Sequence, residues 1–149
     1  MKNQIKKIST LTSAIFVVVM LVSGCKKNEV DVFANSTLPS NYTNQGTITV
    51  KSSNLAICYW DWGTVDGDVI DIIINGKTMI TNKELTANKE CLKVTLPSGE
   101  NWIGIKAINE GFNPPASPRV EISDGKGVQG FDILAEINKP GGYKIKVVL

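Results

Sequence analysis

The chain has no histidine among its 149 residues. This absence excludes a histidine-based catalytic triad, a histidine general base and a histidine-ligated zinc site. Cysteine is also scarce, with three residues, and aromatic residues make up 7% of the chain. The side chains left to build a site are carboxylates, a few thiols and three tryptophans.

The chain also lacks an apolar run long enough to cross a membrane. Its longest apolar stretch, residues 8–22, is diluted by serine and threonine, and a membrane span needs roughly 20 apolar residues. Lys2, Lys6 and Lys7 precede this stretch, and the small residues Ser23-Gly24 and a cysteine follow it. This layout is typical of a secretory signal rather than of a transmembrane anchor.

The run Leu21-Val22-Ser23-Gly24-Cys25 resembles the lipobox of bacterial lipoproteins. The resemblance implies a signal peptide over residues 1–24 and lipidation of Cys25 with acyl chains such as palmitate, so that lipid attaches the protein to a membrane. Lys26, rather than an aspartate, follows the cysteine. By resemblance to lipoprotein sorting signals, this favours the outer membrane. Both its periplasmic face and the cell surface remain open.

Removing residues 1–24 takes away three lysines and no acids, which leaves thirteen basic and fourteen acidic residues. This balance gives no support to nucleic-acid binding, which favours a basic face. Residues 25–46 are rich in asparagine, serine and threonine and are expected to form a flexible tether. Residues 47–149 are then long enough for one domain with one core.

Apolar residues in this domain alternate with a period of two, which is typical of β-strands, and no segment after residue 25 has helical periodicity. The predicted strands are 47–52, 55–60, 70–74, 77–80, 91–96, 103–107, 120–122, 131–137 and 143–149. Asn75-Gly76 predicts a tight hairpin, and Pro140-Gly141-Gly142 predicts a turn. About eight or nine short strands with regular turns favour an all-β antiparallel sandwich, with a closed barrel as the alternative.

Two resemblances bear on this fold. The run Leu96 to Ala107 resembles the E-strand, tight turn and F-strand of immunoglobulin-like domains. The run Trp60 to Asp68, followed by Ile72 to Gly76 and by Asn109 to Pro115, resembles a family of uncharacterised β-sandwich domains from secreted and lipid-anchored bacterial proteins. The family motif reads W-D-x-G-x-x-D-G-D. The resemblances imply an immunoglobulin-like sandwich and carry over no activity.

If Cys25 carries lipid, Cys58 and Cys91 form the remaining cysteine pair in an oxidising compartment. Each alternates with apolar residues of its strand and is therefore expected to face away from the core. In an immunoglobulin-like layout their strands are B and E, which are antiparallel neighbours. We expect a disulfide within one sheet, with two buried free thiols as the alternative.

Three acids occur within eight residues, at Asp61, Asp66 and Asp68, and no lysine or arginine lies between Lys51 and Lys77. Aspartate oxygens are ligands that Ca²⁺ prefers, so these residues are a candidate calcium site. In an immunoglobulin-like layout Glu110 lies at the same pole and is a further candidate ligand. The alternative is that the aspartates only hold turns, because the loop lacks the full D-x-D-x-D-G pattern.

Trp60 and Trp62 are candidate ligand-binding residues, and Trp102 is a third tryptophan that could join them in an aromatic platform for a sugar. Trp60 shares its predicted face with Cys58 and is therefore expected to be exposed. The alternative is that these rings cover the core or an edge of the sandwich.

These observations predict a non-catalytic outer-membrane lipoprotein that acts as a binding or interaction module for a protein or glycan partner. A carbohydrate-binding accessory lipoprotein that uses its tryptophans is the alternative. A small hydrolase that uses a pair of aspartates is a third reading, but a domain of this size with its acids on one loop has no obvious substrate cleft.

Overall fold

The computed structural model describes residues 33–149, so the predicted signal peptide and Cys25 lie outside the described part of the chain. The described residues form nine β-strands and no helix long and apolar enough to cross a membrane. The strands are β1 (Thr43–Val50), β2 (Asn54–Asp61), β3 (Asp68–Ile74), β4 (Lys77–Glu84), β5 (Glu90–Thr95), β6 (Gly99–Glu110), β7 (Pro118–Ser123), β8 (Val128–Asp132) and β9 (Gly141–Val147).

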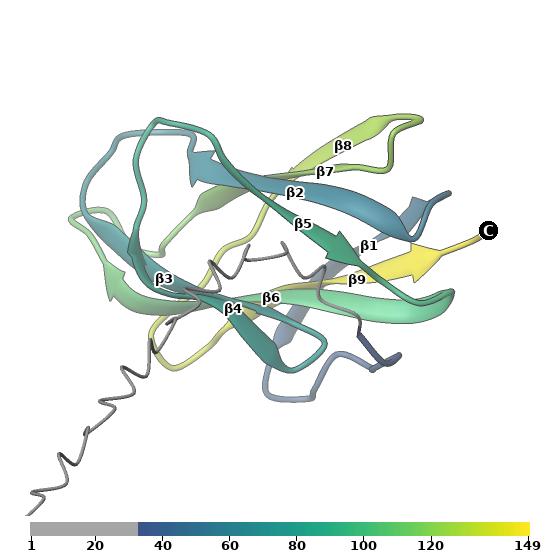
Figure 1. Cartoon of the computed structure of the whole chain (residues 1–149). Helices are drawn as coiled ribbons and strands as arrows, with labels where there is room; N and C mark the ends of the chain where they lie inside the picture. The colour runs from purple at the N-terminus through teal and green to yellow at the C-terminus, as the bar shows by residue number, and fades with distance from the viewer. Residues whose placement is uncertain (1–32) are drawn as a thin grey trace, which may run out of the picture.

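The strands make two sheets that face each other (Figure 1). One sheet has five strands in the order β1-β9-β6-β3-β4, and the other has four in the order β5-β2-β7-β8. All neighbours are antiparallel except β1 and β9, which run parallel. The prediction of an all-β sandwich is confirmed.

The core lies between the two sheets and follows from the period of two. In β2, Leu55, Ile57 and Tyr59 face inward and are buried. The residues that alternate with them, Ala56 and Cys58, are only partly buried, whereas Trp60 near the end of the strand is buried as well. In β3, Ile70 and Ile74 are fully buried among the same core side chains. These β-branched and leucine side chains suit a pleated surface that is covered on one face.

The strand order is consistent with an immunoglobulin-like sandwich. β2 and β5 correspond to strands B and E, and β3, β6 and β9 correspond to strands C, F and G. The β7–β8 hairpin departs from this layout. It interrupts the connection between F and G and pairs with β2, on the side where strand A lies in immunoglobulin domains.

The predicted hairpin at Asn75-Gly76 is confirmed, since both residues have positive φ, at 48° and 86°. The predicted turn at Pro140-Gly141-Gly142 is wrong, because both glycines belong to β9 and the turn lies at residues 137–138. Gly141 is required for a different reason: a Cβ there would come within 2.2 Å of the Leu134 carbonyl oxygen. The strand predicted at 131–137 lies earlier, at residues 128–132.

The predicted tether, residues 25–46, is too long at its C-terminal end. β1 begins at Thr43, and Phe33 is buried in the core cluster. Between them, Ser36 Oγ accepts a hydrogen bond from Trp102 Nε1 (3.1 Å), and the Tyr42 ring lies 5.1 Å from that of Trp102. Aromatic contacts therefore fasten this segment to the five-stranded sheet, and the folded domain begins before residue 47.

The structure contains the Cys58–Cys91 disulfide. The two residues are direct partners in the antiparallel register of β2 and β5, with their Cα atoms 4.0 Å apart. The bond links neighbouring strands of one sheet, as predicted, and closes a sequence separation of 33 residues.

Replacing both cysteines, as Cys58→Ala with Cys91→Ala, should lower the free energy of unfolding by up to roughly 3–4 kcal/mol. The reason is that a cross-link across this loop length reduces the entropy of the unfolded chain. Urea denaturation of both proteins measures the difference, and the wild type in excess reductant should approach the double variant. Two free thiols titrating in the denatured, non-reduced wild type would contradict the prediction.

Asp124 joins two turns at one end of the sandwich. Its Oδ2 accepts from the amide of Lys51 (2.8 Å), and its Oδ1 accepts from the amides of Lys126 and Gly127 (2.8 Å each). These bonds favour the charged carboxylate and hold its pKa below the usual value. The depressed pKa contributes stability above the pKa of the unfolded chain, and this contribution is lost as pH falls through the folded-state pKa.

Asp124→Asn should therefore lower Tm at pH 7, and the gap to the wild type should narrow below about pH 4, near the ordinary aspartate pKa. Thermal melts followed by circular dichroism from pH 7 to pH 2 measure the gap. Glu84→Gln, at an exposed position of β4, is the matched control and should show no such pattern. A gap of constant size across this range would contradict a role for the charge.

Candidate functional site

The predicted acidic residues meet at one pole of the sandwich. Asp61 is the last residue of β2 and Asp68 is the first of β3, so they flank one of the loops that connect the two sheets. Each continues the inward-facing alternation of its strand, and they are 5% and 3% exposed. Period-two alternation thus carries two carboxylates into the end of the core.

Each buried aspartate uses one oxygen to hold a loop. Asp61 Oδ1 accepts from the amide of Gly63 (3.1 Å), and Asp68 Oδ2 accepts from the amide of Ser117 (3.1 Å). The predicted alternative, in which the aspartates accept hydrogen bonds from loop amides, is therefore present in the structure. These hydrogen bonds occupy only one of the two oxygens of each carboxylate.

Asp66 links the β2–β3 loop to the β6–β7 loop. Its Oδ2 accepts from the amides of Phe112 (3.0 Å) and Asn113 (2.7 Å). Gly111 permits this approach, because its φ is +59° and a Cβ there would lie 2.4 Å from Asp66 Oδ1. A glycine at this position is therefore required on both counts.

One carboxylate oxygen each from Asp61, Asp66 and Asp68 lies within 4.8 Å of the other two. Asp61 Oδ2 and Asp68 Oδ1 are buried and have no hydrogen-bond partner. Within residues 33–149, none of the three forms an ion pair. The pole thus gathers negative charge that the described side chains do not neutralise.

The environment of these groups disfavours their charged forms. Burial raises the pKa of the Asp61 carboxyl, the Gly63 amide opposes this shift, and the charge of Asp66 adds to it. Burial also raises the pKa of Asp68, the Ser117 amide opposes the shift, and neighbouring carboxylates add to it. Desolvation and like charge therefore act in the same direction.

Glu110, the further predicted ligand, lies at the same pole but outside this cluster. It is the direct partner of Asp68 in the register of β3 and β6, and its charge raises the pKa of Asp68. Its Oε1, however, accepts from the amide of Ile137 (2.5 Å) in the segment between β8 and β9. Glu110 therefore holds that segment, while the cluster consists of the three aspartates.

The three tryptophans do not form one platform. Trp60 is 9% exposed and lies under Lys89, whose Nζ is 4.3 Å from the ring centroid, so its predicted exposure is wrong. Trp102 is 2% exposed. Trp62 is 67% exposed and has the Arg119 guanidinium 5.6 Å from its ring centroid. Trp60 and Trp102 are therefore buried rings that cover the sandwich, as the alternative predicts. The exposed ring of Trp62 is open to a ligand.

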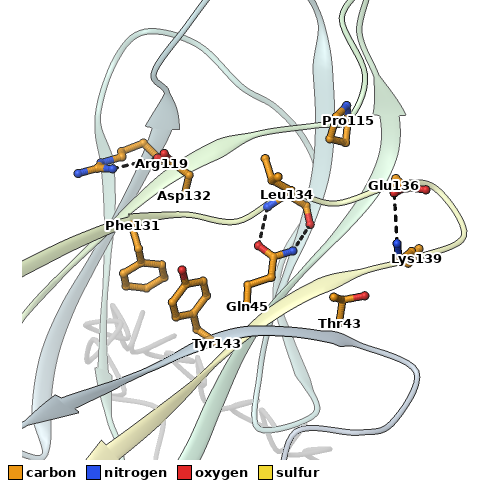
Figure 2. Close-up of a pocket in the computed structure, with 10 residues that line it drawn as sticks. All are labelled: Thr43, Gln45, Pro115, Arg119, Phe131, Asp132, Leu134, Glu136, Lys139 and Tyr143. Atoms are coloured by element: carbon orange, nitrogen blue, oxygen red, sulfur yellow. Dashed lines mark hydrogen bonds and ion pairs between the residues drawn. The ribbon is translucent and has the colours of Figure 1, made fainter.

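A side groove, which local sequence patterns do not predict, lies beside the Arg119 that contacts Trp62. It occupies about 680 Å³ where the edges of the two sheets approach each other. Its lining residues come from β1, β7, β8, β9 and the intervening loops (Figure 2). They are Thr43, Gln45, Pro115, Arg119, Phe131, Asp132, Leu134, Glu136, Lys139 and Tyr143.

Contacts between its own residues hold the groove in shape. Gln45 accepts from the Leu134 amide (2.9 Å) and donates to the Leu134 carbonyl oxygen (2.6 Å). Figure 2 shows Phe131 and Tyr143 ring against ring, with centroids 4.2 Å apart. Arg119 pairs at 3.1 Å with Asp132, its direct partner in the register of β7 and β8. The groove thus offers aromatic surface, charge and hydrogen-bonding groups together.

No family model, curated protein or solved structure matches the chain. The resemblance to the uncharacterised sandwich family, and the lipobox resemblance at Cys25, therefore stay predictions from the residues that carry them.

Proposed function

We propose that the protein is a non-catalytic binding module, held at the outer membrane by lipid on Cys25, and that the side groove is its ligand site. The observation that carries the groove assignment is the open, pre-shaped cavity between the sheet edges. Its volume of about 680 Å³ falls within the roughly 300–1,000 Å³ of small-molecule sites.

The arrangement of the groove supports this role. Phe131 and Tyr143 give the groove aromatic surface, and six of its ten lining residues carry polar or charged side chains. Polar groups beside an aromatic surface fix the orientation of a bound ligand. The polar side chains are already fixed, since Arg119 pairs with Asp132 and Gln45 with the Leu134 backbone. A groove whose side chains are held before binding loses less entropy when a ligand enters.

A non-catalytic role is supported by the placement of the reactive groups. The sequence has no histidine, and both cysteines of the domain are bonded to each other. The buried carboxylates of Asp61 and Asp68 do not line the groove. The carboxylates that do line the groove, Asp132 and Glu136, are each paired with a cation. A ligand in the groove therefore meets two ion pairs and aromatic rings rather than a free nucleophile and base.

Cys25→Ala should abolish labelling by radioactive palmitate and move the protein out of the membrane fraction, because the lipid is the proposed anchor. Cell fractionation and labelling measure both effects, with the Cys58→Ala, Cys91→Ala double variant as a control that keeps Cys25. Continued sedimentation of the Cys25→Ala protein with membranes would refute the lipid anchor.

A photoreactive residue at Thr43, on the rim of the groove, should form a discrete cross-linked adduct in cells. The same residue at Thr78 should not, which makes Thr78 the matched control. It is also exposed, but it lies on β4 at the opposite edge of the same sheet. Equal adducts at both positions, or none at either, would overturn the assignment of the groove.

A carbohydrate ligand is the second candidate, and exposed Trp62 beside groove residue Arg119 favours it. A glycan array probed with the intact protein tests this directly. If sugars bind, Trp62→Ala should weaken binding roughly tenfold, as expected for loss of about 1.4 kcal/mol of aromatic contact. Phe112→Ala, at an aromatic position that is 89% exposed outside the groove, should leave it unchanged. An array without any bound glycan would refute this candidate.

A further inference from the structure

Two buried carboxylate oxygens at the β2–β3 pole have no partner. Asp61 Oδ2 and Asp68 Oδ1 are shielded from solvent and accept no hydrogen bond. Leaving a buried acceptor of a charged group unpaired is strongly unfavourable, because the group loses its contact with water and gains nothing in exchange. Most buried polar atoms of folded proteins are paired, and of the three unpaired side-chain atoms within residues 33–149, two lie in this cluster.

Charge increases the cost. The two groups share the cluster with Asp66, and one oxygen of each lies within 4.8 Å of the others. The ion pairs of residues 33–149 do not include these three aspartates, since their lysines and arginines bind other acids. A cation among the three carboxylates would supply the missing partners and remove the repulsion.

We propose that Asp61, Asp66 and Asp68 bind one calcium ion, which bridges the ends of β2 and β3 and the loop between them. The unpaired oxygens provide direct ligands of the hard, anionic type that Ca²⁺ prefers. Backbone carbonyl oxygens and water complete such shells, which hold six to eight oxygens.

The three oxygens lie close enough to share one calcium ion. Ca–O distances of about 2.3–2.6 Å place two ligands of one ion at most about 4.6–5.2 Å apart, and all three oxygens lie within 4.8 Å of one another. Coordination geometry favours calcium over magnesium, because magnesium requires a strict octahedron, which a loop between two strands does not impose.

The ion would stabilise more than one loop. Asp66 already holds the β6–β7 loop through the amides of Phe112 and Asn113, and Asp68 holds the amide of Ser117. Fixing these carboxylates therefore fixes two of the connections between the sheets at this pole, the β2–β3 loop and the β6–β7 loop. It also orders the segment after Asp61, which carries Trp62 toward Arg119.

The test uses the intact protein, calcium chloride and a chelator. Isothermal titration calorimetry should show one Ca²⁺ per chain, and calcium at a hundred times its Kd should raise Tm by roughly 10 °C. Magnesium should bind at least about tenfold more weakly. Terbium should give luminescence sensitised by the adjacent tryptophans and displaced by calcium.

The variants separate binding from folding. Asp61→Asn and Asp68→Asn retain an oxygen for the Gly63 and Ser117 amides, so they should fold. Both should lose the calcium response and melt in chelator at or above the wild-type temperature, because repulsion is relieved. Asp71→Asn, on β3 outside the cluster, is the matched control and should keep the full calcium response.

Three results would overturn the proposal. The first is the absence of calcium heat and of a Tm shift in the wild type at millimolar calcium. The second is an undiminished calcium response in Asp61→Asn and Asp68→Asn. The third is a higher Tm for these variants without any calcium effect on the wild type, which would mean that a proton is held between the carboxyl groups instead.

Discussion

The two sheets are held together by a layer of branched aliphatic side chains, and the rest of the structure depends on that layer. Ile57 in β2 and Ile72 in β3 are fully buried in it, as is Ile105 in β6. Because inward-facing positions recur every second residue, the alternation that builds the core also determines which residues face inward at the strand ends. Asp61 and Asp68 stand at inward positions one step beyond the apolar residues. The buried charge of the pole is thus a direct consequence of the register of the core.

The side groove follows from a different feature, the β7–β8 hairpin. This hairpin extends the four-stranded sheet and brings β8 opposite the β1–β9 edge of the other sheet (Figure 1). The stacked rings of Phe131 and Tyr143 bridge the two edges. Arg119 lies on this hairpin, lines the groove and contacts Trp62. Trp62 is the residue directly after Asp61 of the acidic cluster. A ligand in the groove and an ion at the pole would therefore act on neighbouring parts of the same loop.

Local patterns in the sequence were sufficient for much of the fold. Alternation located most strands, Asn75-Gly76 located a hairpin, and the strand neighbours of Cys58 and Cys91 followed from an immunoglobulin-like layout. The acid cluster was also accessible, because its three residues lie within eight positions.

What failed depended on distant contacts. Alternation places Trp60 on the outer face of β2 and therefore predicts that it is exposed. The side chain of Lys89, from the β4–β5 connection, covers the ring, and nothing in the sequence around Trp60 indicates this contact. Gln45 meets Leu134 across 89 residues, so no local pattern could place them in one groove. The most direct measurement of the central claim is a crystal structure at high resolution grown with calcium. We expect an ion bonded to oxygens of Asp61, Asp66 and Asp68 at about 2.3–2.6 Å. A proton-bridged contact between the Asp61 and Asp68 carboxyl groups, with no ion, would contradict the account.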